Sequence, residues 1–406
     1  MCSKSWKSIN LKTFWIGKIA YRMVLVRMLK WTACLGLILG LWLGYHEHKL
    51  LQDHLKGNSC KDLHLGLGQE NPLWEDDLKA TIPGLERVLS EIMDLRKEGK
   101  LDDPNPQNRF KRVQHPVAWG CVQATVDIFQ LKNSSDQQGL FAQAKIHPAI
   151  VRFSKNAFLP DFFPKATSIA VKILDLEAQR ADMKEQNEDI RKANQHTQDL
   201  IMIGNPIFPL VAVPQELTIL HEYLAKKQPF SAVFYLLLNR PTLFIRTIVL
   251  LWRGFRTSNP LLENHYTIQA SRLGPNQAIR LALEPCESTI NYSLLGGVNI
   301  TANIQSYLNM QDGCMKLMMQ KQTEACRDQV DDFIHEWSGP WLHVGYLKIK
   351  QGSTLDSSNE HCDNLSFNPF HAPDANRPLG WLGRLRRDVY AHNSARRYSK
   401  NTKTLG

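Results

Sequence analysis

The chain has 406 residues, of which 43% are hydrophobic and 22% are charged. This composition indicates a globular protein with a large core and excludes wholesale disorder. The net charge of +10 comes from the two ends, because residues 1–30 hold seven basic residues and no acid, and residues 377–406 hold eight basic residues and one acid. The rest of the chain is therefore slightly acidic, which argues against nucleic acid as a partner.

An apolar run, Trp31 to Tyr45, follows the basic N-terminal tail. It is shorter than the ~20 residues that span a bilayer, but preceding apolar residues lengthen it if Arg27 and Lys30 extend toward the interface. No small-x-small cleavage site follows Trp42. We predict an uncleaved, single-pass membrane anchor over residues 31–49, with the basic tail 1–30 in the cytoplasm and the later residues outside it. A buried or interfacial helix is the alternative.

Residues 50–105 are predicted to form a helical linker region, and residues 106–400 a second domain. Apolar side chains at helical spacing predict an amphipathic helix from Pro83 to Lys100. Turn-forming residues from Asp102 to Pro106 end it. In the second domain, alternating apolar residues predict barrel strands at Cys121–Phe129, Ala149–Phe153 and Ser168–Leu174.

Two later segments have unusual compositions. Glu177–His196 is a polar run that predicts an exposed helix or mobile loop without a chemical role. Phe230–Trp252 is apolar, but Asn239-Arg240-Pro241 and Arg246 divide it into pieces too short to cross a membrane. We expect helices packed on the barrel there, with an interfacial helix lying on lipid as the alternative.

The cysteines show no C-x-x-C spacing and no arrangement with histidine that is typical of zinc. Outside the predicted anchor there are six of them, at positions 60, 121, 286, 314, 326 and 362. An extracytoplasmic location permits disulfides, whose pairing the sequence does not give. Cys314 and Cys326 could be neighbours on a helical hairpin, but we expect single buried thiols.

Two distant motifs carry the chemistry of the chain. The first is Arg112-Val113-Gln114-His115, and the second contains Arg386 and Tyr390. Residues four apart on a helix face the same side, so Arg386 can reach the Tyr390 oxygen. A phenol has an ordinary pKa of about 10, and a neighbouring cation favours its anion. The two motifs resemble the R-x-x-H and R-x-x-x-Y of catalases.

Further matches lie between these motifs in the same order as in catalases. Val151-Arg152-Phe153-Ser154 resembles V-R-F-S, Pro164 with Ser168–Ile173 resembles P-x-G-F-A-V-K-F, and Gly204-Asn205-Pro206-Ile207-Phe208 resembles G-N-N-T-P-I-F. The later matches resemble the short catalase-related branch, which includes catalase-related peroxidases and allene oxide synthase-like proteins: Asn259–Glu263, Tyr266, Arg272–Gly274, Leu365–His371 and Arg377–Gly380. The resemblance runs from about Arg109 to Arg397.

This resemblance implies an α+β fold, with a catalase-like antiparallel β-barrel, flanking helices and, in this chain, an added N-terminal anchor. It implies haem b, with Tyr390 as the axial ligand of the iron. His115 would be the distal acid and base, and Asn205 would orient the peroxide. Arginines 112, 152 and 397 would bind the propionates. The full set of residues expected to contact the cofactor is Arg112, Arg152, Ser154, Phe208, Arg386, Tyr390 and Arg397.

The implied function is a membrane-anchored, haem-dependent oxidoreductase that metabolises hydrogen peroxide or an organic or lipid hydroperoxide. Departures from the family leave the reaction open between catalase, peroxidase and isomerase. Gln114 replaces an apolar residue before the distal His, and the Asn205 loop is two residues shorter. After Tyr390 the chain has Ala-His-Asn-Ser in place of Pro-Asp-Thr. The alternative is a non-catalytic catalase-like binding or scaffold protein, and a homo-oligomer also stays open.

Overall fold

The computed structural model describes most of the chain beyond the N-terminal segment. The described residues are 60–101, 110–116, 118–155, 167–208, 211, 213–226, 228–241, 259–287, 299–356, 362 and 364–402, with Tyr45 and residues 244, 245 and 248. The predicted basic tail, the predicted anchor apart from Tyr45, and the predicted linker end at Asp102–Pro106 lie outside them. Within the described part, no helix is both long and apolar enough to cross a membrane.

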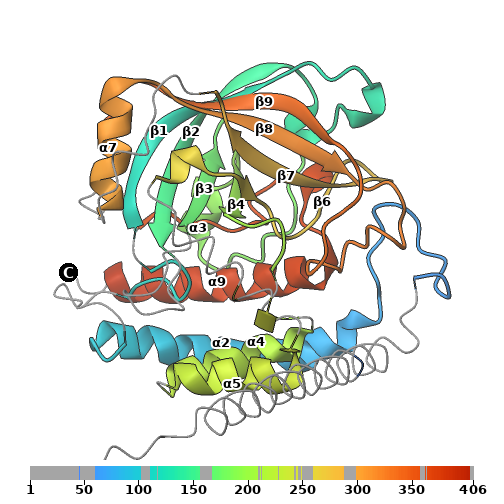
Figure 1. Cartoon of the computed structure of the whole chain (residues 1–406), viewed down its shortest axis with the longest axis vertical. Coiled ribbons are helices and arrows are strands. Elements are labelled where there is room, and N and C mark those ends of the chain that lie inside the picture. The colour runs from blue at the N-terminus through green and yellow to red at the C-terminus, as the bar shows by residue number, and fades with distance from the viewer. Residues whose placement is uncertain are drawn as a thin grey trace, which may run out of the picture.

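The described strands form one antiparallel sheet that closes into a barrel (Figure 1). The strand order is β5-β4-β3-β2-β1-β9-β8-β7-β6, and β5 also pairs with β7. That extra pairing closes a ring of eight strands and leaves β6 outside it. The strands are β1 (Ala118–Ile128), β2 (Lys145–Lys155), β3 (Thr167–Ile173), β4 (Gln198–Ile203), β5 (His265–Tyr266), β6 (Ser271–Arg272), β7 (Ala278–Pro285), β8 (Gly313–Lys321) and β9 (Trp341–Ile349).

Successive side chains of a strand point alternately into and out of the barrel, and the inward-pointing ones fill its interior. In β8, for example, Met315, Leu317 and Met319 are buried, and the residues between them are only partly buried. β3 is buried on both faces. The first three strands agree with the predicted ones, so the expected antiparallel barrel with flanking helices is confirmed.

A layer of helices covers one side of the barrel (Figure 1). It contains α2 (Trp74–Lys97), α4 (Pro214–Ala225), α5 (Pro229–Asn239) and α9 (Gly380–Thr402). A second apolar core joins α2, α4 and α9. Two shorter helices, α3 (Glu188–Ala193) and α7 (Ile300–Met310), and the 3-10 turns η1 (Ser134–Asp136), η2 (Gly139–Phe141), η3 (Pro260–Leu262) and η5 (Asp374–Asn376) complete the described elements.

The first helix begins earlier than the sequence predicts. Pro83 lies inside α2 and not at its start. The apolar face continues toward the N-terminus through Leu78 and Trp74, and Trp74 contacts Trp381 of α9 at 6.0 Å between ring centroids. Pro83 is exposed, so the carbonyl group that it leaves without an N–H partner faces water. Tertiary packing therefore outweighs the cost of an internal proline.

The expectation of single buried thiols is wrong. The described cysteines form three disulfides, Cys60–Cys326, Cys121–Cys362 and Cys286–Cys314. Cys314 does not pair with Cys326, because Cys314 lies in β8 and Cys326 lies in the turn that follows that strand. Two of the bridges join residues more than 240 positions apart, which restricts the unfolded chain strongly.

Buried charges tie the barrel to α9. Lys172 of β3 donates to Asp199 of β4 at 2.6 Å, and His371 contacts both Asp199, at 2.8 Å, and Glu185, at 3.2 Å. Glu185 in turn accepts a hydrogen bond from Ser394 of α9 at 3.0 Å. The polar run 177–196 was expected to be exposed and without a role. That expectation is wrong for Glu185, whose carboxylate is buried because it completes this network.

Replacing Lys172 with Met should therefore lower the free energy of unfolding by about 3–5 kcal/mol, because it leaves the Asp199 carboxylate buried without its cation. Urea unfolding of both proteins measures the difference. The matched control is Lys348→Met, which removes a lysine that is half exposed and 3.2 Å from Asp127, and which should cost about 1 kcal/mol or less. Equal decreases in the free energy of unfolding for the two variants would show that the buried network does not hold the fold together.

Candidate functional site

A cavity lies between strands β2–β4 and helices α2 and α9. Its volume is about 90 Å³, and the empty space between its lining atoms, open solvent included, is about 740 Å³. The lining residues are Leu89, Arg112, Val113, Gln114, His115, Arg152, Ser154, Ser168, Ala170, Ile201, Ser366, Phe367, Val389, Tyr390, Asn393, Ser394 and Arg397.

One wall is the segment from Arg112 to His115, which has no regular secondary structure. Arg96 of α2 holds it by donating to the carbonyl oxygens of Arg112, at 2.8 Å, and of Val113. His115 has a φ of 53°, a left-handed conformation that costs a non-glycine residue roughly 1–3 kcal/mol. Arg152 of β2 donates to the His115 carbonyl oxygen at 2.9 Å. Strain is thus held at one residue by contacts from two neighbouring elements.

The His115 imidazole is kept neutral. Burial lowers its pKa to about 3, and the positive charges of Arg152, Arg386 and Arg112 act in the same direction. Its Nδ1 atom is buried without a hydrogen-bond partner among the described residues. A neutral imidazole near neutral pH can accept a proton, which is the first requirement for a general base.

Helix α9 forms another wall of the cavity. Gly380 opens the helix with a φ of 78°, and a Cβ atom there would lie 2.7 Å from the Val330 carbonyl oxygen, so glycine is required. Arg386 donates to the Tyr390 hydroxyl at 3.1 Å and to the side-chain oxygen of Gln269. The helical spacing of Arg386 and Tyr390 predicts the first contact. Nothing in the sequence indicates Gln269, which lies more than a hundred positions away.

Three arginines occupy the same cavity. Arg112 and Arg397 both donate to the Leu365 carbonyl oxygen, Arg397 at 3.1 Å, and Arg152 lies beside His115. Guanidinium groups bind carboxylates through paired N–H donors. This wall of the cavity therefore suits a ligand that carries carboxylates.

The structure does not bring all the predicted residues together. Arg112, His115, Arg152, Ser154, Tyr390 and Arg397 line the cavity, and Arg386 contacts Tyr390 from behind. Asn205 and Phe208 are not among the lining residues. The Asn205 amide donates to the Ile207 carbonyl oxygen, and Phe208 packs against Phe333 with 6.5 Å between ring centroids. The shorter loop at Asn205 is the sequence signal for this difference.

Other polar groups complete the lining. The side-chain oxygens of Ser366 and Asn393 are buried without hydrogen-bond partners among the described residues. Asn393 lies one turn beyond Tyr390, which is the signal that could have identified it. The Gln114 amide lies 3.4 Å from the His221 ring of α4, so the residue before His115 connects the cavity to that helix.

The donor set fits haem. Among the described residues, no group of three or more His, Cys, Asp and Glu side chains could hold a metal ion by itself. The cavity instead offers a phenol with an arginine beside it, three further cations and buried polar atoms that lack partners. Tyrosine is a known protein ligand of haem iron. These features match the chemistry that a porphyrin with carboxylates would need.

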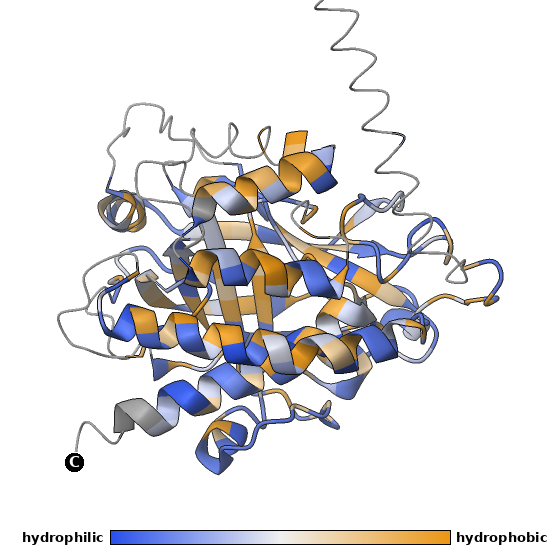
Figure 2. Ribbon diagram, turned by 90° about the horizontal axis from the view of Figure 1, so that it is seen from below, coloured by the Kyte–Doolittle hydropathy of each residue, from blue (hydrophilic) through white to orange (hydrophobic). Residues whose placement is uncertain are grey.

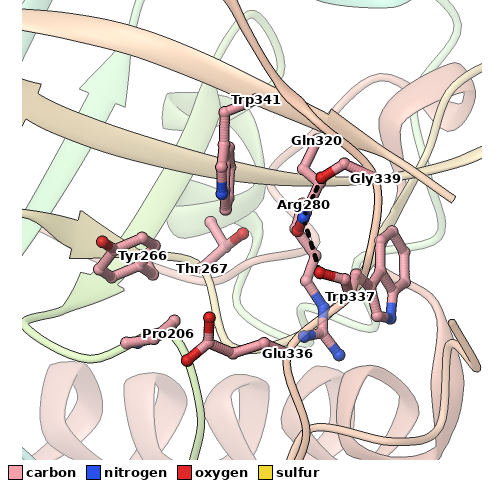
Figure 3. A pocket seen from close by; sticks show the side chains of 9 residues that line it. All are labelled: Pro206, Tyr266, Thr267, Arg280, Gln320, Glu336, Trp337, Gly339 and Trp341. Carbon is pink, nitrogen blue, oxygen red and sulfur yellow. Dashed lines mark hydrogen bonds between the residues drawn. The ribbon is translucent and has the colours of Figure 1, made fainter.

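A second cavity of about 230 Å³ lies elsewhere on the barrel (Figure 3). Its polar groups are largely engaged within the protein. Arg280 donates to the carbonyl oxygens of His335 and Asp332 and lies 4.5 Å from the Trp337 ring, and Gln320 donates to two further carbonyl groups. This second cavity contains no residue of the Arg112–His115 motif or of the motif with Arg386 and Tyr390. The lining residues are Pro206, Tyr266, Thr267, Arg280, Gln320, Glu336, Trp337, Gly339 and Trp341.

Three catalases are among the solved structures with a similar fold. A fungal catalase has a TM-score of 0.53 at 14% identity, over 71% of this chain and 59% of that chain. A bacterial catalase has a TM-score of 0.50 at 12% identity, over 75% and 59%. Catalase A from Saccharomyces cerevisiae has a TM-score of 0.52 at 13% identity, over 75% and 63%.

These similarities establish a catalase-like fold. No family model matches the chain, and no curated protein matches its sequence. The alignments span less than two thirds of each catalase. At 12–14% identity the similarity concerns the fold alone.

The low pKa of His115 predicts a pH effect on stability. As pH falls below about 6.5, the unfolded chain binds a proton at His115 that the folded chain refuses until about pH 3, so stability falls with falling pH. The His115→Gln variant should show a shallower fall in urea unfolding between pH 6.5 and about pH 4. The control His196→Gln changes an exposed histidine and should keep the wild-type slope. The same slope in all three proteins would contradict a neutral, buried His115.

Proposed function

We propose that this protein binds haem b in the cavity and metabolises peroxides. The observation that carries the proposal is that Tyr390, with Arg386 at 3.1 Å, lines the same cavity as the neutral His115. The catalase-like fold supports it. The alternative is a catalase-like binding or scaffold protein that lacks efficient peroxide turnover.

The residues that would hold haem follow from their chemistry. Tyr390 would supply an oxygen ligand to the iron, and the guanidinium of Arg386 donates a hydrogen bond to that oxygen. Arg112, Arg152 and Arg397 would bind the propionate carboxylates. When bound, haem supplies a redox-active iron at which a peroxide can react.

His115 is suited to moving a proton. Because its imidazole is neutral, it can accept a proton from a hydroperoxide and return it to the departing oxygen. Arg152 fixes the backbone from which the ring extends. The cations around the ring disfavour a lasting imidazolium, so the proton is released again readily.

We propose that the substrate of this protein is hydrogen peroxide or an organic or lipid hydroperoxide. Gln114 places an amide beside His115 where catalases usually have an apolar side chain. Relatives that convert fatty-acid hydroperoxides also have a polar residue there, which argues against fast dismutation of hydrogen peroxide. We also propose that the domain lies outside the cytoplasm and is held there by the N-terminal anchor. The three disulfides support an oxidising compartment, since such bonds are rare in the cytosol.

Haem binding can be tested by absorption spectroscopy of the full chain expressed with haem. We expect a ferric spectrum with a tyrosinate charge-transfer band in the wild type, and its loss or shift in Tyr390→Phe, which removes the ligand oxygen. Tyr398→Phe is the matched control, because Tyr398 is on the same helix but bonds to Asp189. A folded protein without haem would refute the proposal and favour the scaffold alternative.

The role of His115 can be tested separately. His115→Gln should retain haem, because Tyr390 and the arginines remain, but should consume peroxide about 10²–10⁴-fold more slowly without its general base. Rates are compared at equal haem content for hydrogen peroxide and an organic hydroperoxide, with His196→Gln as the control. Unchanged turnover in the haem-loaded variant would exclude His115 as the proton carrier.

A further inference from the structure

Helix α5 presents an exposed apolar surface. Its sequence is apolar on every side apart from Ser231, Tyr235 and the terminal Asn239. Figure 2 shows it as a largely orange helix at the edge of the helical layer. Phe230 is 74% exposed, Phe234 62% and Leu238 71%, and Val233 and Leu237 are also exposed. These five side chains are called the α5 face below.

The α5 face is not part of the protein core. Leu236 is the buried large side chain of the helix, and α5 packs on α4 through the Tyr235 and Tyr223 rings, 6.3 Å apart. The expectation that this segment packs on the barrel is therefore wrong for α5. A helix that is apolar all round is normally buried in protein or in lipid, and clustered exposed apolar side chains mark an interaction surface.

The basic sequence that includes α5 indicates which partner the α5 face meets. Residues 223–262 contain six Lys or Arg residues and no Asp or Glu. Within the described part, Lys226 is exposed just before α5, and Arg240 just after it is paired with Glu216. Apolar and aromatic side chains with flanking cations are the pattern of helices that lie in the interface of an anionic membrane.

We propose that α5 docks on an anionic lipid surface, with the α5 face inserted among the headgroups and upper acyl chains. This inference goes beyond the proposed function and does not rest on it, since docking needs neither haem nor turnover. It also places the cavity near lipid, because α4 lies between α5 and Gln114, and the His221 ring of α4 contacts Gln114 at 3.4 Å.

The test is spin labelling of the full chain with Phe234→Cys, in a background with Cys2→Ser and Cys34→Ser so that the label has one target. Electron paramagnetic resonance then compares access of oxygen, which concentrates in lipid, with access of a water-soluble nickel chelate. The control label is at Met310→Cys, an exposed position at the end of α7, which lies against the barrel away from the helical layer (Figure 1). Vesicles are phosphatidylcholine with or without phosphatidylglycerol.

On vesicles that contain phosphatidylglycerol, we expect the label at position 234 to become more accessible to oxygen and less accessible to the nickel chelate. Both changes should be smaller at high salt. The label at position 310 should stay in water. Adding Phe230→Ser and Leu238→Ser should lower the ratio of lipid-immersed to water-exposed label roughly tenfold or more. Circular dichroism checks that these variants fold. The N-terminal segment is the same in every variant, so tethering alone cannot produce the difference.

Three results would overturn the proposal. Unchanged nickel access at position 234 on vesicles would show that the α5 face stays in water. An immobilised label with spin–spin broadening would assign the face to a second copy of this chain. A label closed to both reagents without broadening would show that another segment of the same chain covers it. Loss of haem or activity would bear on the proposed function and leave this measurement intact.

Discussion

The buried network of Lys172, Asp199, His371, Glu185 and Ser394 is the constraint on which the site depends. Charges with almost no solvent contact are tolerated only when each has its partners in place, because desolvation alone costs several kcal/mol for each ion. The network joins β3 and β4 to α9 through side-chain contacts of 2.6 to 3.2 Å. Ser394 is one helical turn beyond Tyr390, so the contacts that stabilise the barrel also fix how far Tyr390 lies from the strands. The position of the phenol is therefore a property of the core and not of α9 alone.

Electrostatics links the two sides of the cavity. Burial is the main cause of the low pKa of His115, and the charges of Arg152, Arg386 and Arg112 lower it further. Of these, Arg152 and Arg112 are also expected to bind carboxylates. Carboxylates bound to Arg112 and Arg152 would neutralise part of this charge and raise the pKa of His115 toward its ordinary value. The strained backbone at His115, held by Arg96 and Arg152, keeps the ring in place while this change occurs.

The sequence predicted what depends on local spacing and ordered motifs, and missed what depends on long-range packing. Arg386 and Tyr390 are four residues apart on a helix, so their contact follows from helical geometry, and alternation was enough to locate β1 to β3. Six of the predicted site residues, from three segments, line one cavity. The disulfides could not be paired because their partners meet only in the folded barrel. Glu185 looked like part of a solvated run, since its partners His371 and Ser394 lie about two hundred positions away. Asn205 was placed by its motif, but a loop two residues shorter directs its amide to the neighbouring backbone.

The exposed α5 face, the extracytoplasmic location and the polar cavity wall are separate proposals that bear on one question, which is the peroxide that this protein meets. Hydrogen peroxide is small and soluble in water, so its concentration at a membrane is close to that in solution. Hydroperoxides of lipid chains are confined to the bilayer, and a protein docked through α5 would meet them at a much higher local concentration. If the position of the protein at the membrane selects the lipid hydroperoxide, the cavity does not need a shape that excludes other peroxides. Such selection requires only that the cavity open toward the membrane, and α4 connects Gln114 in the cavity lining to the helix with the exposed apolar surface.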